Sequence, residues 1–300
     1  MELTVGFALA KPAEVLGAEP YMHELVAGIE RVLVPQGGSV LLRIVPSAAE
    51  VQATIRRWAD GGLVDAVILM DLEPGDPAVA LVRELGMPAV VSGDLDTASG
   101  LSSVWSQDEL VMDAAVEAML RLGHTRIAHL SGPERMAHTR LRRAAFERAA
   151  AAAGAKTAVR EGDYSERSGR ELAAELLREN AEERPTAIVA DNDVMAIGAL
   201  EAAREAGLDV PADVSIVAWD DSALCQLSQP ALSAMSHDVQ TIGELLATAA
   251  LAAVAGEAPG AVRAPVAAFV ARGSTAAAPV AAAAGVAPEA SGGSEASGDR

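Results

Sequence analysis

Runs of β-branched and aliphatic residues alternate with stretches of helical apolar spacing along most of this chain, and no other feature restricts its fold more. The runs cover residues 3–9, 39–45, 64–70, 89–91, 126–130, 187–190 and 214–218. Runs that are apolar throughout are typical of strands buried on both faces. Between the first two runs, several residues fall on one side of a helix: Leu25, Val26, Ile29, Val32 and Leu33. Strand followed by helix, repeated, predicts an α/β fold with parallel sheets covered by helices on both faces.

Helix start signals support this alternation. Ser47 followed by Glu50 has the spacing of a capping box, and Asp76 followed by Pro77 suits the first positions of a helix. The strand–helix unit repeats more often than one doubly wound sheet holds comfortably, so we expect two lobes, each with a doubly wound parallel sheet. The turn at residues 122–124 separates a long helix from a new strand, and we place the boundary between the two lobes there.

The late part of the sequence supplies elements to both predicted lobes. A strand at 232–236, a helix at about 239–254 and a strand at 263–272 all need partners. We assign residues 1–123 with about 237–262 to an N-terminal lobe, and 124–236 with about 263–273 to a C-terminal lobe. From Ser274 onward, Ala, Gly, Ser, Pro and Glu dominate without a periodic apolar face, which predicts a disordered tail over 274–300.

Charge and cysteine content restrict the partners and the compartment. The chain has 42 acidic and 23 basic residues, a net charge of −19, which repels nucleic acid and anionic lipid. A single cysteine, Cys225, excludes an internal disulfide and fits a reducing compartment. The first residues lack the pattern of a secretory signal, and no apolar run is long enough to cross a membrane. We therefore expect a cytoplasmic protein that does not contact a membrane.

Motifs of common enzyme classes are absent from the sequence. It contains no G-x-S-x-G elbow, no phosphate-binding P-loop, no G-x-G-x-x-G fingerprint and no H-E-x-x-H helix. Cys225 has no evident histidine partner and is expected to be a packed side chain rather than a nucleophile. The triplet Asp191-Asn192-Asp193 lacks the glycine and distal glutamate of a calcium loop. We predict no catalysis, no metal and no cofactor.

Five segments, in this order and at these spacings, closely resemble the LacI/GalR family of bacterial transcription regulators. They are residues 122–133 (LGHTRIAHLSGP), 142–146 (RRAAF), 185–193 (PTAIVADND), 211–221 (PADVSIVAWDD) and 272–275 (RGST). The resemblance covers nearly all of residues 3–275. It implies two periplasmic-binding-protein-like lobes, three crossing segments, a small polar effector such as a sugar in the cleft between the lobes, and a homodimer.

Family members carry a DNA-reading helix-turn-helix ahead of this core. No recognition-helix pattern precedes Leu3, so we expect the DNA-contacting part to be absent from this sequence. Either the start has been trimmed, or this relative has lost the module. By this interpretation DNA is a partner only through the missing headpiece.

The resemblance assigns three polar residues to the effector. Arg142, four residues before Phe146, matches the family's effector-binding arginine, whose planar fork can bind two adjacent hydroxyls. Asn192 and Asp220 each follow an apolar run, where parallel strands end and open α/β sheets place ligands. The alternatives are a surface arginine and a turn aspartate. For the neighbouring Asp191 we favour a helix N-cap or first-turn acid.

Aromatic and histidine residues are the further candidates. Tyr164 aligns with an aromatic that some family members place against the ligand, and a half-buried loop tyrosine is the alternative. His138 and His237 lie near the expected cleft rims, as do Phe7 and Tyr21, and a structural imidazole is the alternative for both histidines. Trp219 is expected in the core. Asp108 lies near the family's first-lobe acidic position, but Gln107 occupies the expected column.

The leading hypothesis is therefore the effector-sensing core of a LacI/GalR-type transcription regulator. The site residues are Arg142, Asn192, Asp220, Tyr164, His138 and His237. The alternatives are a solute-binding protein of an uptake system and a stand-alone cytoplasmic ligand sensor. The missing signal sequence and the segment Gly123-His124-Thr125-Arg126-Ile127 argue against the uptake protein.

Overall fold

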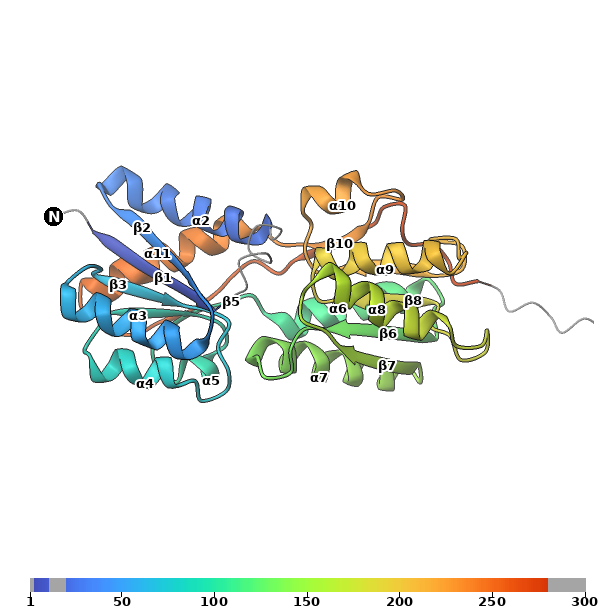
Figure 1. Ribbon diagram of the computed structural model, residues 1–300, viewed down its shortest axis with the longest axis horizontal. Helices are drawn as coiled ribbons and strands as arrows, with labels where there is room; N and C mark the ends of the chain where they lie inside the picture. The colour runs from blue at the N-terminus through green and yellow to red at the C-terminus, as the bar shows by residue number, and fades with distance from the viewer. Residues whose placement is uncertain (1–2, 11–19, 280–300) are drawn as a thin grey trace, which may run out of the picture.

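The computed structural model describes residues 3–10 and 20–279, which form two α/β lobes side by side along the long axis of the molecule (Figure 1). Each lobe contains a six-stranded sheet with helices on both faces. The strand order is β11-β5-β4-β3-β1-β2 in the first lobe and β12-β10-β9-β8-β6-β7 in the second. All strand pairs are parallel except β10 with β12. The predicted fold class is confirmed.

The first lobe is built mostly from the early part of the chain. Its strands are β1 (Thr4–Ala10), β2 (Ser39–Val45), β3 (Ala66–Leu69), β4 (Ala89–Ser92), β5 (Ser102–Trp105) and β11 (Ala261–Arg263). Its helices are α2 (Pro20–Leu33), the short 3₁₀ helix η1 (Val34–Gln36), α3 (Ala48–Gly61), α4 (Pro77–Glu84), α5 (Leu95–Ala98) and α11 (Val239–Val254). Ser47 and Asp76 cap α3 and α4 as predicted, because their side chains accept from the backbone N–H groups of Glu50 and Ala78.

The second lobe repeats this plan. Its strands are β6 (Arg126–Ser131), β7 (Lys156–Glu161), β8 (Ala187–Ala190), β9 (Ser215–Ala218), β10 (Ser233–Ser236) and β12 (Ala268–Val270). Its helices are α6 (Asp108–Arg121), α7 (Ala137–Ala152), α8 (Glu166–Leu177), α9 (Asp193–Glu205) and α10 (Ala223–Leu227). In both lobes the strand order reverses direction beside the first strand. Such a reversal opens a crevice at the carboxyl ends of the strands.

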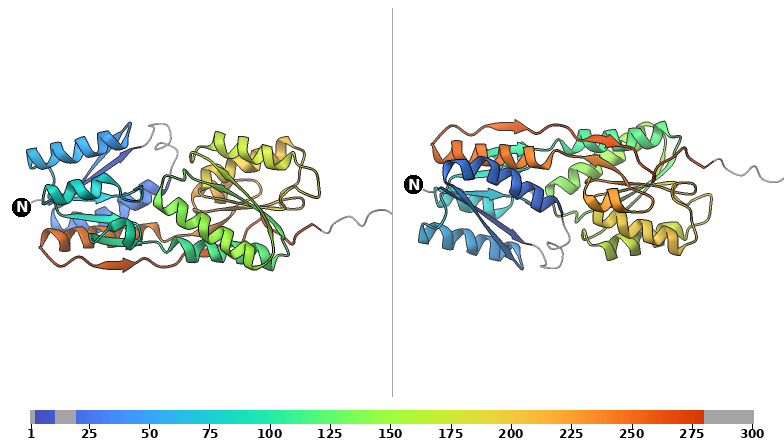
Figure 2. Two further views of the ribbon diagram at one scale, coloured as in Figure 1. Left: turned by 90° about the horizontal axis from the view of Figure 1, so that it is seen from below. Right: turned by 90° about the horizontal axis from the view of Figure 1, so that it is seen from above.

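Three segments cross between the lobes, at residues 106–107, 237–238 and 264–267. They run close together on one side of the molecule (Figure 2), and the Gln107 side chain donates to the carbonyl of Ala264 at 2.8 Å. The first crossing lies earlier than the boundary predicted at residue 123. Helix α6 belongs to the second lobe because Val111, Met112 and Ala115 pack with Ile127 and Phe146 in that core. The turn at 122–124 therefore lies inside the second lobe.

Several predicted strands differ from the observed ones. The run at 39–45 forms β2, an edge strand whose residues are mostly exposed, so the expectation of burial on both faces is wrong there. Two strands were not predicted, β5 and β7; β7 also lies at an edge and lacks an apolar run. The predicted last strand at 263–272 is two short strands, β11 and β12, one in each sheet.

The segment after β12 packs against the second lobe as far as Ala278. Ser274 is fully buried, its hydroxyl donates to the carbonyl of Ile216 at 2.6 Å, and Ala276 contributes a carbonyl to His124. The predicted start of the disordered tail at 274 is therefore too early, because hydrogen bonds rather than an apolar face hold these residues. Residues 280–300 of the predicted tail lie outside the described residues. No helix in the described part of the chain is long and apolar enough to span a membrane.

Candidate ligand-binding cavity

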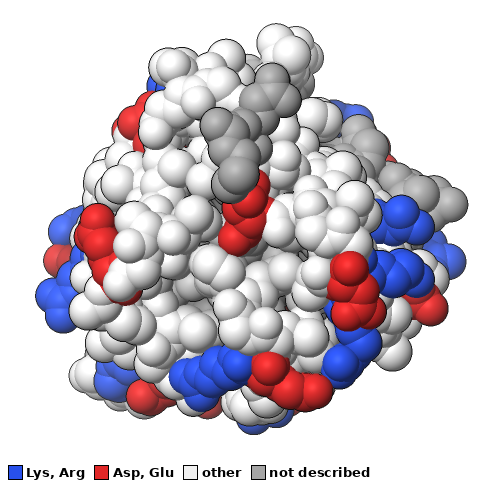
Figure 3. All heavy atoms as spheres, turned by 90° about the vertical axis from the view of Figure 1, so that its left-hand side faces the viewer, with Lys and Arg blue, Asp and Glu red and all other residues white. Residues whose placement is uncertain are grey.

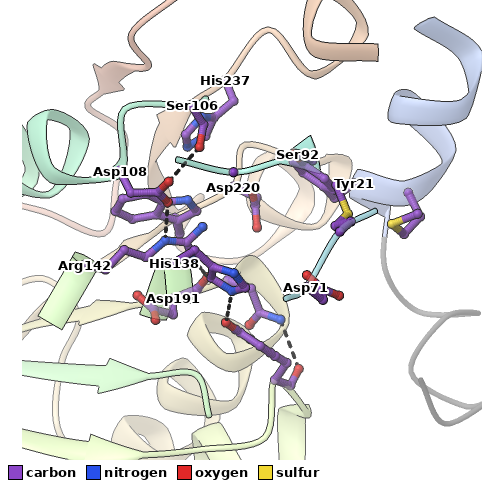
Figure 4. Close-up of a pocket in the computed structure, with 16 residues that line it drawn as sticks. Tyr21, Asp71, Ser92, Ser106, Asp108, His138, Arg142, Asp191, Asp220 and His237 are labelled. Carbon is purple, nitrogen blue, oxygen red and sulfur yellow. Dashed lines mark hydrogen bonds and ion pairs between the residues drawn. The ribbon is translucent and has the colours of Figure 1, made fainter. Parts of the chain in front are cut away.

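A cavity of about 100 Å³ lies between the two lobes, at the carboxyl ends of both sheets. All six residues that the sequence assigned to the site line it: Arg142, Asn192, Asp220, Tyr164, His138 and His237. Figure 4 shows side chains from both lobes converging on this space. Residues far apart in the sequence meet here because the strands that precede them end at the same edge of a sheet.

The first lobe contributes residues that the sequence did not assign to the site. Asp71, Ser92 and Ser106 lie at or just after the ends of β3, β4 and β5, and Met22 is on the first turn of α2. Tyr21, on the same turn, also lines the cavity, and the sequence had placed it near the rim of the cleft. Met70 and Gly93 of the first lobe, with Asp108, Asp191 and Trp219 of the second, complete the lining. The position of a polar residue directly after a buried strand was the available signal for Asp71. The expectation that Phe7 lies at the rim is wrong, because its side chain is fully buried in the first-lobe core.

Arg142 on α7 is held from three directions. Its Nε donates to Asp108 Oδ1 at 2.7 Å, its Nη1 donates to the carbonyl of Asp191 at 3.2 Å, and its guanidinium lies 4.0 Å above the Trp219 ring. Burial alone would lower the pKa of Arg142, but the charge of Asp108 raises it above the ordinary value. The arginine is therefore a buried cation in a fixed orientation, and Trp219 is both a core residue and part of the cavity wall.

Tyr164 and His138 form a second cluster on the wall. The Tyr164 hydroxyl lies 2.8 Å from His138 Nε2 and 3.0 Å from Thr139 Oγ1, both within hydrogen-bond distance. Tyr164 has a left-handed backbone with φ of 69°. Its ring lies so close to Gly132 that a Cβ there would overlap it. Burial, and then the charge of Arg142, lower the pKa of His138, which favours its neutral form.

Asn192 combines a structural role with a place on the wall. Its Oδ1 accepts from the backbone N–H of Met195 at 2.7 Å and caps α9, and its Nδ2 donates to the carbonyl of Tyr164 at 3.0 Å. The expectation that Asp191 caps this helix is therefore wrong. A primary amide has two hydrogens and two lone pairs, so one donor and one acceptor site of Asn192 remain for a ligand.

Asp220 and His237 lie on the side of the cavity nearer α10. Asp220 projects toward the centre of the space in Figure 4. The ring of His237 lies 5.5 Å from that of Trp219, and its Nε2 is buried without a hydrogen-bond partner in the described part of the chain. Burial, and then the charge of Arg142, lower the pKa of His237 to about 4. At neutral pH it therefore offers an uncharged imidazole to whatever occupies the cavity.

A larger chamber of about 450 Å³ adjoins the cavity. Three residues are shared by the two spaces: Tyr21, Asp220 and His237. Polar side chains such as Glu24, Gln226 and Gln240 line the outer chamber. The two spaces together therefore offer hydrogen-bonding groups along an extended path rather than at a single point.

The lining suits recognition of hydroxyl groups rather than bond cleavage. Carboxylates, amide and guanidinium groups bind polyols through several directed hydrogen bonds. Burial raises the pKa of Cys225 behind the Asp220 loop to about 12, so its thiol stays protonated and unreactive. No cluster of potential metal ligands occurs within residues 3–10 and 20–279.

Known proteins share this architecture. A family model of the periplasmic binding protein-like domain matches residues 116–275. The solved structure of a LacI family transcriptional regulator from Bifidobacterium animalis is 32% identical, covers 92% of this chain and 98% of its own, and superposes with a TM-score of 0.83. The solved complex of the transcriptional regulator CelR with cellobiose is 27% identical, with coverages of 90% and 84% and a TM-score of 0.83. CelR of Thermobifida fusca is 27% identical over 276 residues, which are 87% of this chain and 77% of CelR.

Two doubly wound lobes with a polar cavity between them define a ligand-binding protein of the periplasmic-binding-protein-like class. The match to the Bifidobacterium regulator extends over both lobes. The chain belongs to the LacI family of transcriptional regulators and contains the effector-binding domain of that family.

Proposed function

We propose that this chain senses a neutral sugar in the cavity between its lobes. The observation that carries the proposal is the fixed guanidinium of Arg142 over Trp219, in a cavity that Asp220 and Asn192 also line. Such a set can donate to and accept from adjacent hydroxyl groups of a sugar. CelR, which was solved with cellobiose, has the same fold and supports the choice of a sugar.

The ligand would act by favouring closure of the lobes. Besides the three crossing segments, direct contacts already join the two lobes. The backbone N–H of Ala137 donates to the carbonyl of Leu72 at 2.9 Å, and Arg135 lies 3.7 Å from Glu73. A ligand that touches both lobes binds the closed state more tightly than the open one and shifts the population toward it. A coupling of about 1–3 kcal/mol is enough for an allosteric response.

The proposed readout is transcription, through a DNA-binding headpiece and a homodimer. Closure changes the angle between the lobes, and in a symmetric dimer this moves the two attached DNA-reading units relative to each other. The net charge of −19 supports an indirect role of this domain in DNA binding, because phosphate backbones attract basic surfaces.

A thermal-shift series with and without sugars tests the proposal. Ribose, glucose, maltose and cellobiose are added to the wild type, Arg142→Lys and Arg143→Lys. Lysine keeps a positive charge beside Asp108 but loses the fork, so Arg142→Lys should lower the affinity for the responding sugar about tenfold or more. Arg143 pairs with Glu147 on the surface, and its variant should respond like the wild type.

Two results would contradict the proposal. One is a wild type that no neutral sugar stabilises at millimolar concentration. The other is an Arg142→Lys variant whose affinity for the responding sugar equals that of Arg143→Lys, because the guanidinium would then have no part in binding.

A further inference from the structure

In the second-lobe wall of the cavity, the lining residue Asp191 forms a buried hydrogen-bonded pair with His129, which is not a lining residue. His129 on β6 and Asp191 at the end of β8 are both almost completely buried. The Nε2–H of His129 donates to Asp191 Oδ1 at 2.8 Å, and the other oxygen of Asp191 accepts from the backbone N–H of Gly132 at 2.9 Å. Both carboxylate oxygens thus bond to the end of β6 rather than to the space between the lobes.

The Asp191 carboxylate is charged despite its burial. Burial opposes ionisation, but the charges of His129 and Arg142 and the hydrogen bonds from His129 and Gly132 lower its pKa to about 2. An ionised, fully bonded carboxylate ties the ends of β6 and β8 together at this point. A buried charge with several good partners fixes one geometry, because any displacement leaves it unpaired.

Three of the proposed ligand residues depend on this junction. The backbone carbonyl of Asp191 accepts from Arg142 Nη1 at 3.2 Å, and Asn192 is the next residue in the chain. Gly132, bonded to the Asp191 carboxylate, is the residue against which the ring of Tyr164 rests. The ring of His129 also packs 5.0 Å from that of Phe146, one helical turn after Arg142 on α7.

We propose that His129 and Asp191 are a positioning pair that sets the orientation of Arg142 and so determines ligand affinity through that guanidinium. The effect on ligand affinity rests on the proposed function, in which Arg142 binds the sugar. The effect on the orientation of Arg142 does not, and it can be measured without a ligand.

The experiment compares two substitutions of His129 of different chemistry. His129→Leu removes the N–H donor, whereas His129→Gln keeps an N–H group near the position of Nε2. The first readout needs no ligand: it is the Nε–H resonance of Arg142 in a ¹⁵N–¹H correlation spectrum, assigned by its loss in Arg142→Lys. We expect His129→Leu to shift or broaden this resonance and His129→Gln to leave it close to the wild-type position.

The second readout is affinity for the sugar that stabilises the wild type most in the thermal-shift series. We expect His129→Leu to weaken binding about tenfold and His129→Gln to weaken it by less than about threefold. In the Arg142→Lys background, His129→Leu should weaken sugar binding by less than a further factor of about two, because the two residues act through one contact.

An unchanged Arg142 resonance in His129→Leu would overturn the inference. An equal loss of affinity with and without the Arg142 guanidinium would also overturn it, since that result marks a general structural effect. If His129→Leu does not fold, Asp191→Asn, which keeps the size of the side chain, is read by the same resonance. A failure of Arg142→Lys to weaken sugar binding would instead overturn the proposed function and leave the positioning result standing.

Discussion

His237 lies in an environment unlike that of a surface histidine. It lies on a crossing segment between the lobes, beside Trp219, and burial and the charge of Arg142 lower its pKa to about 4, while Asp108 acts in the opposite direction. The unfolded chain, with an ordinary histidine pKa, binds a proton at a pH where the folded protein does not. Protonation therefore favours unfolding between pH 6.5 and about 4.

This gives a signed prediction for stability. Lowering the pH from 7.5 to 5 should reduce the free energy of unfolding of the wild type by about 2 kcal/mol more than that of His237→Asn. The reason is that His237 takes up its proton only on unfolding. Urea denaturation of both proteins at the two pH values measures the difference. The control is His23→Asn, which replaces an exposed histidine and should lose as much stability as the wild type. Equal losses in wild type and His237→Asn would contradict the burial argument.

The family resemblance of short segments led to part of the cavity. Arg142, Asn192 and Asp220 were found because each lies in a segment that resembles the family, and two of them, Asn192 and Asp220, lie two residues after the end of a strand. Asp108 was set aside because its spacing was off by one residue, yet it pairs with Arg142. Gln107 does not take this place because its backbone is left-handed, with φ of 60°, at the start of α6. Its side chain therefore bonds to a neighbouring crossing segment, at the carbonyl of Ala264. No sequence pattern signals that backbone conformation in a residue other than glycine.

At the level of elements, close helix pairs organise both lobes. In the first lobe α2 and α11 approach so closely that a Cβ on Gly28 would lie 2.1 Å from the carbonyl oxygen of Gln240. In the second lobe α8 and α9 approach in the same way, and a Cβ on Gly198 would lie 2.2 Å from the carbonyl oxygen of Glu166. These contacts are backbone against backbone, so neither partner can move aside as a side chain would.

Gly28→Ala should therefore destabilise the first lobe by about 1–3 kcal/mol, the usual range for overpacking. The control is Gly260→Ala, because a Cβ at Gly260 meets no atom within 4 Å. Chemical denaturation of both variants gives the comparison. A Gly28→Ala variant as stable as Gly260→Ala would mean that the two helices are not in contact as described.

Element boundaries were predicted best where the apolar pattern was continuous. The strand at 187–190 and the helix at 239–254 were predicted with their observed limits. The boundary between the lobes was placed one helix too late, because α6 follows the first lobe in sequence while its apolar face packs against α7. Tertiary packing, which a local pattern does not contain, decides where such a helix belongs.

At the scale of the whole molecule, the distribution of exposed apolar residues supports the proposed homodimer. Leu227 and Leu224 on α10 are 81% and 40% exposed, and Leu41 and Leu42 on β2 are also exposed. In Figure 1, α10 lies along the same upper side as α2 and β2.

At the end of the first lobe shown in Figure 3, the Lys and Arg side chains lie mainly around the edge, next to Asp and Glu, rather than in one continuous basic surface.

Leu227→Glu should accordingly shift the protein from dimer to monomer at micromolar concentration, because a buried charge is costly in an apolar interface. Light scattering coupled to size exclusion measures the mass. The matched control is Leu95→Glu on α5, which is 57% exposed on the opposite side of the first lobe and should remain dimeric. A monomeric wild type, or dimers of both variants, would contradict the assignment of this surface.

The most direct test of the proposed function is a crystal structure grown with the sugar that stabilises the protein most. We predict a sugar ring between the lobes, with hydroxyl groups bonded to the Arg142 guanidinium and the Asp220 carboxylate. A sugar bound elsewhere, with the space between Arg142 and Asp220 filled only by solvent, would contradict it.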